Sequence, residues 1–164
     1  MNEYDDKLVD FIKQNSINAE HLVFQTSCHS VEEAAASANT SVDNFVKNVC
    51  IINETNNELI VCIVPGTKRL DIKKLALLIG TKKLRFATTE EILSKTGYPM
   101  GGTPSFGYSA RFFIDNEVLT KEIVYSGGGS QNSLTKISPL EMICPFGHHS
   151  LKAVVSLGPK GKVV

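Results

Sequence analysis

The sequence predicts a mixed α/β (α+β) domain in which helices surround a strongly bent, barrel-like mixed sheet. Two observations support this fold class: segments with helical periodicity alternate with β-rich runs, and no repeat or low-complexity linker interrupts them. The chain has 164 residues, of which 42% are hydrophobic, so we expect one domain over 1–164 with a substantial core. Its 17 basic and 17 acidic residues balance. This balance excludes a generally basic nucleic-acid binder and a wholly disordered chain, although a local basic patch stays open.

Capping residues followed by apolar residues at helical spacing predict the helices. Asp5 and Asp6 are the expected caps of the first helix, and Ser30 is the expected cap of the second. A glycine is expected to end a helix at Gly80 and at Gly97. The expected helices are, in chain order, 8–12, 31–38, a short turn at 41–44, 71–80, 89–97 from Thr89, and one that begins at Ser138-Pro139.

β-branched and apolar runs bounded by turn residues predict the strands. The turn residues of 53–57 separate two such runs and therefore predict a hairpin, which Pro65-Gly66 ends. The segment 150–164 is expected to be a C-terminal tail, with a frayed end or late turn at 158–162. The expected strands are 21–25, 46–52, 59–64, 84–87, 111–114, 123–125 and 133–137.

Several classes of protein are not expected. No apolar run is long enough to cross a bilayer, and the first six residues are acidic and polar, unlike a secretory signal, so we expect a cytoplasmic protein without membrane contacts. No glycine-rich nucleotide motif follows a strand. The four cysteines lack C-x-x-C spacing and are expected to be free thiols, with Cys50 and Cys62 in the core.

Lys47 is the first candidate functional residue. It lies at the mouth of the most apolar strand, where an ammonium group would be a point charge for a phosphate or a carboxylate. The alternative is a solvated lysine at a strand end.

Two glycine-rich segments are the next candidates, 96–107 and 125–133. Such loops bring backbone groups close to a ligand and accept positive φ values, and long irregular loops are often functional. The alternatives are an elaborate connection for the first segment and a flexible hairpin for the second.

Histidine and cysteine residues predict less. His29 directly precedes a helix, and no neighbouring carboxylate would make it a general base; adjacent residues such as Cys28 and His29 seldom face each other. Cys144, His148 and His149 form one tight group, whereas a zinc site needs paired groups of ligands. We therefore expect no metal and no cofactor, and we interpret this group as a polar C-terminal turn. The alternative is a metal-dependent protein that uses Cys144, His148 and His149.

The motifs together resemble the YbaK/proline-tRNA-synthetase-associated editing domain family over roughly residues 20–144. The lysine step of that family is matched by Val46-Lys47-Asn48, and its Gly-x-x-Pro signature falls on Gly101 and Pro104 within the loop 96–107. The other matching blocks follow in the family's order at 64–66, 69–75, 80–84 and 113–115.

The resemblance implies a YbaK-like fold and an enzyme, an aminoacyl-tRNA deacylase that acts in trans on the tRNA 3′ end. Members remove small amino acids such as Ala or Cys, here with tRNA-Pro as one candidate source, because binding alone discriminates poorly between similar side chains. A substrate hydroxyl activates water, Lys47 holds the terminal nucleotide, and Gly101 and Gly102 position the ester or its oxyanion. An aminoacyl-tRNA synthetase is a further partner that the resemblance suggests, whereas neither a membrane nor DNA is expected.

The remaining candidate substrate-binding residues flank these positions. They are Thr26, Ser27, His29, Pro104, Gly128, Gly129, Asn132 and Ser133. The chain departs from the family in two places. One subgroup carries an acidic residue after the late glycine pair where this chain has polar uncharged residues, and Asn48 replaces the commoner Thr or Ser. The alternative function is therefore a binding module for the tRNA end or a nucleotide, associated with a synthetase, without turnover.

Overall fold

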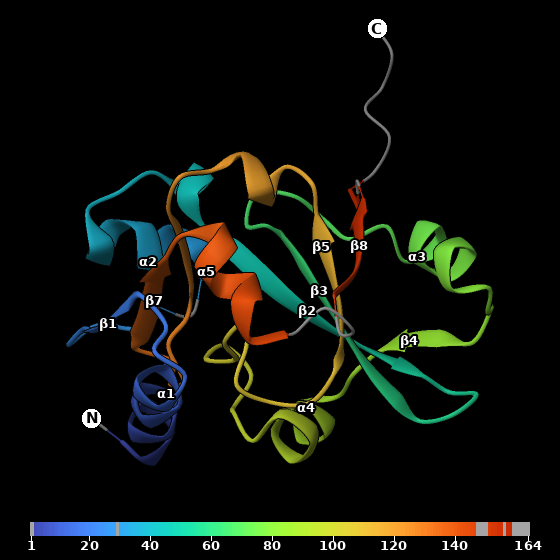
Figure 1. Ribbon diagram of the computed structural model, residues 1–164, viewed down its shortest axis with the longest axis horizontal. Helices are drawn as coiled ribbons and strands as arrows, with labels where there is room; N and C mark the ends of the chain where they lie inside the picture. The colour runs from blue at the N-terminus through green and yellow to red at the C-terminus, as the bar shows by residue number, and fades with distance from the viewer. Residues whose placement is uncertain (1, 29, 147–150, 156, 159–164) are drawn as a thin grey trace, which may run out of the picture.

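The computed structural model describes residues 2–28, 30–146, 151–155 and 157–158 (Figure 1). It confirms the mixed α/β fold class. Instead of one barrel-like sheet, however, the strands form a five-stranded sheet in the order β4-β2-β3-β5-β8 and a three-stranded sheet in the order β1-β7-β6. The strands are β1 (Ala19–Val23), β2 (Val46–Asn53), β3 (Glu58–Pro65), β4 (Leu84–Phe86), β5 (Arg111–Asp115), β6 (Val124–Gly127), β7 (Ser133–Ile137) and β8 (Leu151–Val155). The helices are α1 (Glu3–Gln14), α2 (Val31–Ala38), α3 (Ile72–Ile79), α4 (Thr89–Thr96) and α5 (Pro139–Ile143), with 3-10 turns η1 (Val42–Asn44), η2 (Val118–Thr120) and η3 (Cys144–Phe146).

The hairpin of β2 and β3 is the centre of the larger sheet. The two strands pair antiparallel along their full length, from Val46 opposite Pro65 to Asn53 opposite Glu58. On the far side of β2, β4 pairs only with the last three residues, from Ile51 to Asn53. The first half of this edge of β2 is therefore not paired with β4, and a single bridge from Phe45 to Tyr125 links it to the smaller sheet.

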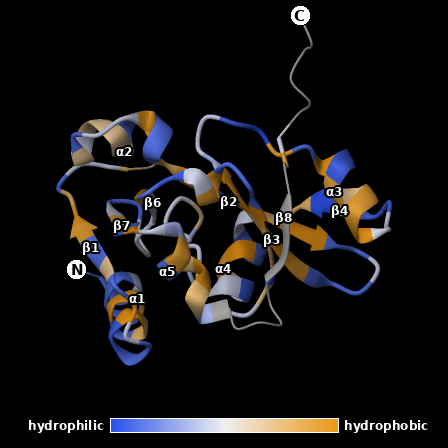
Figure 2. Cartoon of the chain, turned by 45° about the horizontal axis from the view of Figure 1, so that its top comes forward, coloured by the Kyte–Doolittle hydropathy of each residue, from blue (hydrophilic) through white to orange (hydrophobic). Residues whose placement is uncertain are grey.

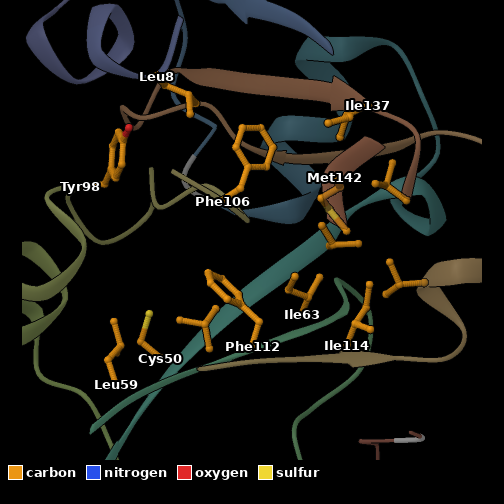
Figure 3. Close-up of a cluster of buried hydrophobic side chains, with 14 of the residues drawn as sticks. Leu8, Cys50, Leu59, Ile63, Tyr98, Phe106, Phe112, Ile114, Ile137 and Met142 are labelled. Atoms are coloured by element: carbon orange, nitrogen blue, oxygen red, sulfur yellow. The ribbon is translucent and has the colours of Figure 1, made fainter. Parts of the chain in front are cut away.

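The largest core lies between the two sheets. Figure 3 shows Leu8, Phe106 and Ile137 on one side of this core, with Phe112 and Ile63 of the larger sheet facing them. Because strand side chains alternate between faces, Ile51 and Cys62 point to the other face, where Leu75 of α3 covers them (Figure 1). Figure 2 shows hydrophobic residues on β2 and β3 and a mixed surface on α1, which covers the smaller sheet.

Local sequence explains where the helices begin and end. The Asn2 side chain caps α1 and forms a capping box with Asp5, so the predicted caps Asp5 and Asp6 are wrong by one turn. α4 starts at Thr89 as predicted, and Thr88 caps it. The predicted caps of α2 and α3 are confirmed, since Ser30 accepts from the Glu33 N–H and Asp71 accepts from two N–H groups of the first turn.

Two strand predictions need correction. The first strand spans Ala19–Val23 rather than 21–25, because it pairs in register with Ser133–Ile137 of β7. The expected C-terminal tail 150–164 contains β8, which pairs parallel with β5. Residues 150, 156 and 159–164 of this segment lie outside the described residues. No helix within the described part of the chain is long and apolar enough to cross a membrane.

Candidate functional site

A cavity of about 450 Å³ lies where β4 leaves the edge of β2 uncovered. Its wall is formed by consecutive residues of β2, by α2, by the last three residues of β6 and by the loop that contains Gly101 and Thr103. The predicted convergence is therefore seen: Lys47 of β2 and Gly101 of the glycine-rich loop, 54 positions apart in the sequence, line the same cavity.

Lys47 is the charged member of the cavity wall. No other Lys, Arg, His, Asp or Glu among the described residues lines the cavity. Partial burial lowers the pKa of the Lys47 ammonium, the nearby Arg69 lowers it further, and Glu32 of α2 acts in the opposite direction. Lys47 makes no ion pair with a described carboxylate within 4 Å, so its charge is available to an anionic ligand.

The glycine-rich loop presents its backbone to this cavity at Gly101. Gly101 is exposed and has φ +86°, a conformation that favours glycine. Within the described part of the chain, the N–H groups of Gly101 and Thr103 have no acceptor. The Gly102 N–H, in contrast, donates to the Pro99 carbonyl at 3.0 Å. The two amides that are left for a ligand oxygen are thus those of Gly101 and Thr103, whereas the sequence suggested Gly101 and Gly102.

Asn48 fixes this loop to the sheet. Its Nδ2 donates to the Thr103 carbonyl at 2.9 Å and to the Ser126 Oγ at 3.1 Å. Its Oδ1 accepts from the Ser105 Oγ at 2.7 Å, and the hydroxyls of Ser105 and Ser126 lie 2.7 Å apart. The residue that departs from the usual lysine step therefore joins β2, the loop and β6 beneath the cavity.

The second glycine-rich segment packs behind the cavity wall. The Gly129 N–H donates to the Gly102 carbonyl at 2.8 Å, and a Cβ on Gly102 would lie 2.7 Å from the Gly129 carbonyl oxygen. A Cβ on Gly129, where φ is +110°, would lie 2.7 Å from the Tyr4 carbonyl oxygen of α1. Gly128 is also buried, against the backbone of Leu134. Gly128 and Gly129 therefore permit close contact between backbone segments and do not line the cavity. Gly127 of the same segment does line it.

Polar side chains hold that segment against α1 and against β1 and the residue that follows it. The buried Ser133 hydroxyl donates to Asp5 at 2.7 Å, and the His21 Nε2 donates to the Gly128 carbonyl at 2.7 Å. The Asn132 Nδ2 donates to the Phe24 carbonyl at 2.9 Å. Ser133 and Asn132 therefore make internal contacts and do not line the cavity.

The other predicted binding residues are also away from the cavity wall. Thr26 and Ser27 are exposed, and the Thr26 hydroxyl lies 3.0 Å from that of Ser37. Pro104 is buried, and its carbonyl accepts from the Tyr108 hydroxyl at 2.7 Å. His29 lies outside the described residues. Of the candidates that the structure describes, Lys47 and Gly101 thus line the cavity, and the others lie outside its wall.

Sequence patterns missed much of the cavity wall. Its apolar end contains Cys28 and the stacked rings of Phe45 and Tyr125, whose centroids are 5.1 Å apart. At the other end lie Phe86, which is 57% exposed, and Met100. The distances between these residues depend on sheet pairing, which no local motif encodes.

The cavity contains no pair of side chains that resembles a nucleophile and its base. Burial raises the pKa of the Cys50 thiol to about 12, so this thiol is a poor nucleophile near neutrality. Among the described residues, no group of three His, Cys, Asp or Glu side chains could hold a metal ion; His148 and His149 lie outside that range. The cavity wall thus offers a cation and backbone amides, groups that can bind an anion and a carbonyl oxygen.

Comparisons with known proteins agree with this geometry. The sequence profile of the aminoacyl-tRNA editing domain family matches residues 25–144. The uncharacterised protein YwhH of Bacillus subtilis is 28% identical over 73% of this chain and 76% of its own length. The proline–tRNA ligase of Thermodesulfovibrio yellowstonii is 29% identical over 72% of this chain, which spans 20% of that enzyme. EbsC of Enterococcus faecalis, named as a candidate Cys-tRNA(Pro)/Cys-tRNA(Cys) deacylase, is 24% identical over 67% of this chain and 68% of its own length.

Solved structures share the fold. A crystal structure of the hypothetical protein APE2540 has 30% sequence identity and a TM-score of 0.81, and the match covers 94% of this chain and 99% of that one. A candidate trans-editing enzyme for prolyl-tRNA synthetase has 24% identity and a TM-score of 0.86, with 98% and 99% covered. Because its sequence identity is only 24%, the comparison with this enzyme supports the fold alone.

Proposed function

We propose that this chain, which belongs to the aminoacyl-tRNA editing domain family, deacylates mischarged tRNA in trans. Membership confirms the resemblance seen in the sequence and the expected enzyme class, an aminoacyl-tRNA deacylase. The substrate, the roles of individual residues and the cytoplasmic location are parts of the proposal.

One observation carries the proposal: Lys47 and the free amides of Gly101 and Thr103 belong to a single cavity. The 3′-aminoacylated terminal adenosine of a tRNA has its 5′ phosphate on one side and the ester carbonyl on the other. Lys47 would hold the phosphate as a point charge. The two amides would donate to the carbonyl oxygen as it becomes an oxyanion.

Hydrolysis then needs no side-chain base. Water attacks the ester carbonyl carbon and gives a proton to the neighbouring hydroxyl of the terminal ribose, which passes its own proton to the ribose oxygen of the ester. The bond between that carbon and the ribose oxygen breaks, the oxygen takes a proton, and the free amino acid and the tRNA 3′ end leave. Removing competing solvent and holding these groups in position supplies the catalysis.

The amino acid is proposed to be small and uncharged. The described cavity wall has no carboxylate to pair with a cationic side chain, and it is largely apolar at the end formed by α2 and Tyr125. Ala and Cys are the candidates, and EbsC and the proline–tRNA ligases among the relatives support tRNA-Pro as one source. Docking on a synthetase in the cytoplasm would supply such tRNAs.

The test is deacylation of a panel of mischarged tRNAs by the wild type, Lys47→Ala and Lys13→Ala. We expect the wild type to release at least one small amino acid, Lys47→Ala to lose that activity with its fold intact, and Lys13→Ala, an exposed change on α1, to match the wild type. Unchanged turnover in Lys47→Ala would contradict the assignment. If the wild type binds tRNA but cleaves no ester, the chain is the binding module instead.

A further inference from the structure

Phe86 is unusual among the exposed apolar residues of this chain. It ends β4, is 57% exposed and lines the cavity. The more exposed Leu77 of α3, at 84%, and Leu140 of α5, at 72%, do not belong to the cavity wall. An exposed aromatic ring at the mouth of a ligand cavity offers a flat surface to a planar ligand.

The pairing of β2 places this ring on the same face of the sheet as Lys47. Phe86 lies directly opposite Ile51, and side chains on β2 alternate, so Lys47, Val49 and Ile51 share a face with Phe86. This is the face on which α3 packs, whereas Asn48 and the loop at Thr103 lie on the other face. The cavity reaches both faces around the edge of β2, because the consecutive residues 46–50 line it. Lys47 and Ile51 are four residues apart, or about 13 Å along the strand. A single nucleotide bridges such a separation together with the reach of the Lys47 side chain, when its phosphate lies at the Lys47 end and its base at the Phe86 end.

The neighbouring residues favour this orientation over its reverse. The cations, Lys47 in the cavity wall and Arg69 close to it, lie at the end away from Phe86. Around Phe86 the cavity wall is apolar, with Ala87, Ile92 and Met100. A phosphate belongs at the first end, and a nucleobase at the second.

We propose that Phe86 is the stacking platform for the terminal base of the tRNA, so that the cavity edge from Lys47 to Phe86 is a subsite for one nucleotide. The proposal rests on the proposed function and adds to it a residue that binds the base. Stacking on an aromatic side chain is tolerant of base identity, so the platform contributes affinity and placement, and other groups would select the amino acid.

The test compares Phe86→Ala and Phe86→Trp with the wild type on a tRNA that the wild type deacylates. Phe86→Ala is expected to raise KM about tenfold or more while kcat changes little, and Phe86→Trp to keep KM near the wild-type value. Adenosine 5′-monophosphate is expected to inhibit the wild type competitively and Phe86→Ala at least tenfold more weakly. Leu77→Ala, a matched removal of exposed apolar surface, is expected to leave all these constants unchanged.

Three outcomes would overturn the proposal. They are a wild-type KM in Phe86→Ala, an equal rise of KM in Leu77→Ala, and unchanged inhibition of Phe86→Ala by the nucleotide. These outcomes differ from failure of the proposed function, in which the wild type itself would release no amino acid from any tRNA.

Discussion

Replacing Asn48 with alanine tests how the glycine-rich loop is held at the cavity. The change removes three hydrogen bonds, which join Asn48 to the Thr103 carbonyl and to the hydroxyls of Ser105 and Ser126. Each such bond contributes about 1 kcal/mol net. The two serines keep their mutual bond at 2.7 Å, and water from the cavity would replace part of the loss. We therefore expect the free energy of unfolding to fall by about 2 kcal/mol.

That loss can be measured by thermal unfolding. In a domain of this size about 2 kcal/mol corresponds to a decrease in Tm of about 4–8 °C. Because the Thr103 carbonyl would no longer fix the loop, the Gly101 and Thr103 amides would move from their positions, and we expect kcat for deacylation to fall about 10- to 100-fold.

Asn44→Ala is the matched control. Asn44 makes one described side-chain hydrogen bond, to the Thr40 hydroxyl at 3.0 Å, and does not line the cavity. We expect a loss of about 1 kcal/mol in stability and an unchanged kcat. A wild-type Tm and kcat in Asn48→Ala, or an equal fall of kcat in Asn44→Ala, would refute the reasoning.

Three other predictions follow from the same geometry. Gly101→Ala and Gly80→Ala both place a Cβ at a positive φ, so each should lose about 1 kcal/mol of stability, but only the first should slow deacylation, since Gly80 ends α3 in open space; equal rates in both would contradict this. Iodoacetamide should alkylate the exposed Cys144 of the native protein well before Cys50, whose thiol pKa is about 12, as peptide mass mapping would show; early labelling of Cys50 would contradict its burial. Because the pKa of Lys47 is lowered, its ammonium should lose its charge, and tRNA binding should weaken, at a pH below the usual lysine pKa near 10.4. Lys47→Arg, which keeps its charge, should bind tRNA up to a higher pH. Identical pH profiles of binding for the two proteins would contradict the role of the charge.

Much of the fold is local enough to be predicted from the sequence. The β2–β3 hairpin follows from two apolar runs around turn residues, and α3 follows from Asp71 at its start and Gly80 at its end. The division into two sheets could not be predicted, because it depends on which distant strands pair. β8 was missed for the same reason: its partner is β5, far earlier in the chain.

The site was predicted in part. Lys47 and Gly101 carry local signals, a cation in an apolar strand and a glycine in a long loop, and the structure brings both to one cavity. Gly129 and Ser133 also lie in a glycine-rich segment, but their role in the structure is packing. Gly129 permits close contact with the backbone of α1, and the buried Ser133 hydroxyl bonds to Asp5 of that helix. Phe86 carries no local signal, because its exposure results from the short pairing of β4 with β2.

The most direct test of the shared site is a structure of the protein with a non-hydrolysable analogue of 3′-aminoacyl-adenosine 5′-monophosphate. We expect the phosphate end of the ligand at Lys47 and its carbonyl oxygen within hydrogen-bond distance of the Gly101 and Thr103 amides. A ligand bound elsewhere, with Lys47 and Gly101 both untouched, would contradict the account.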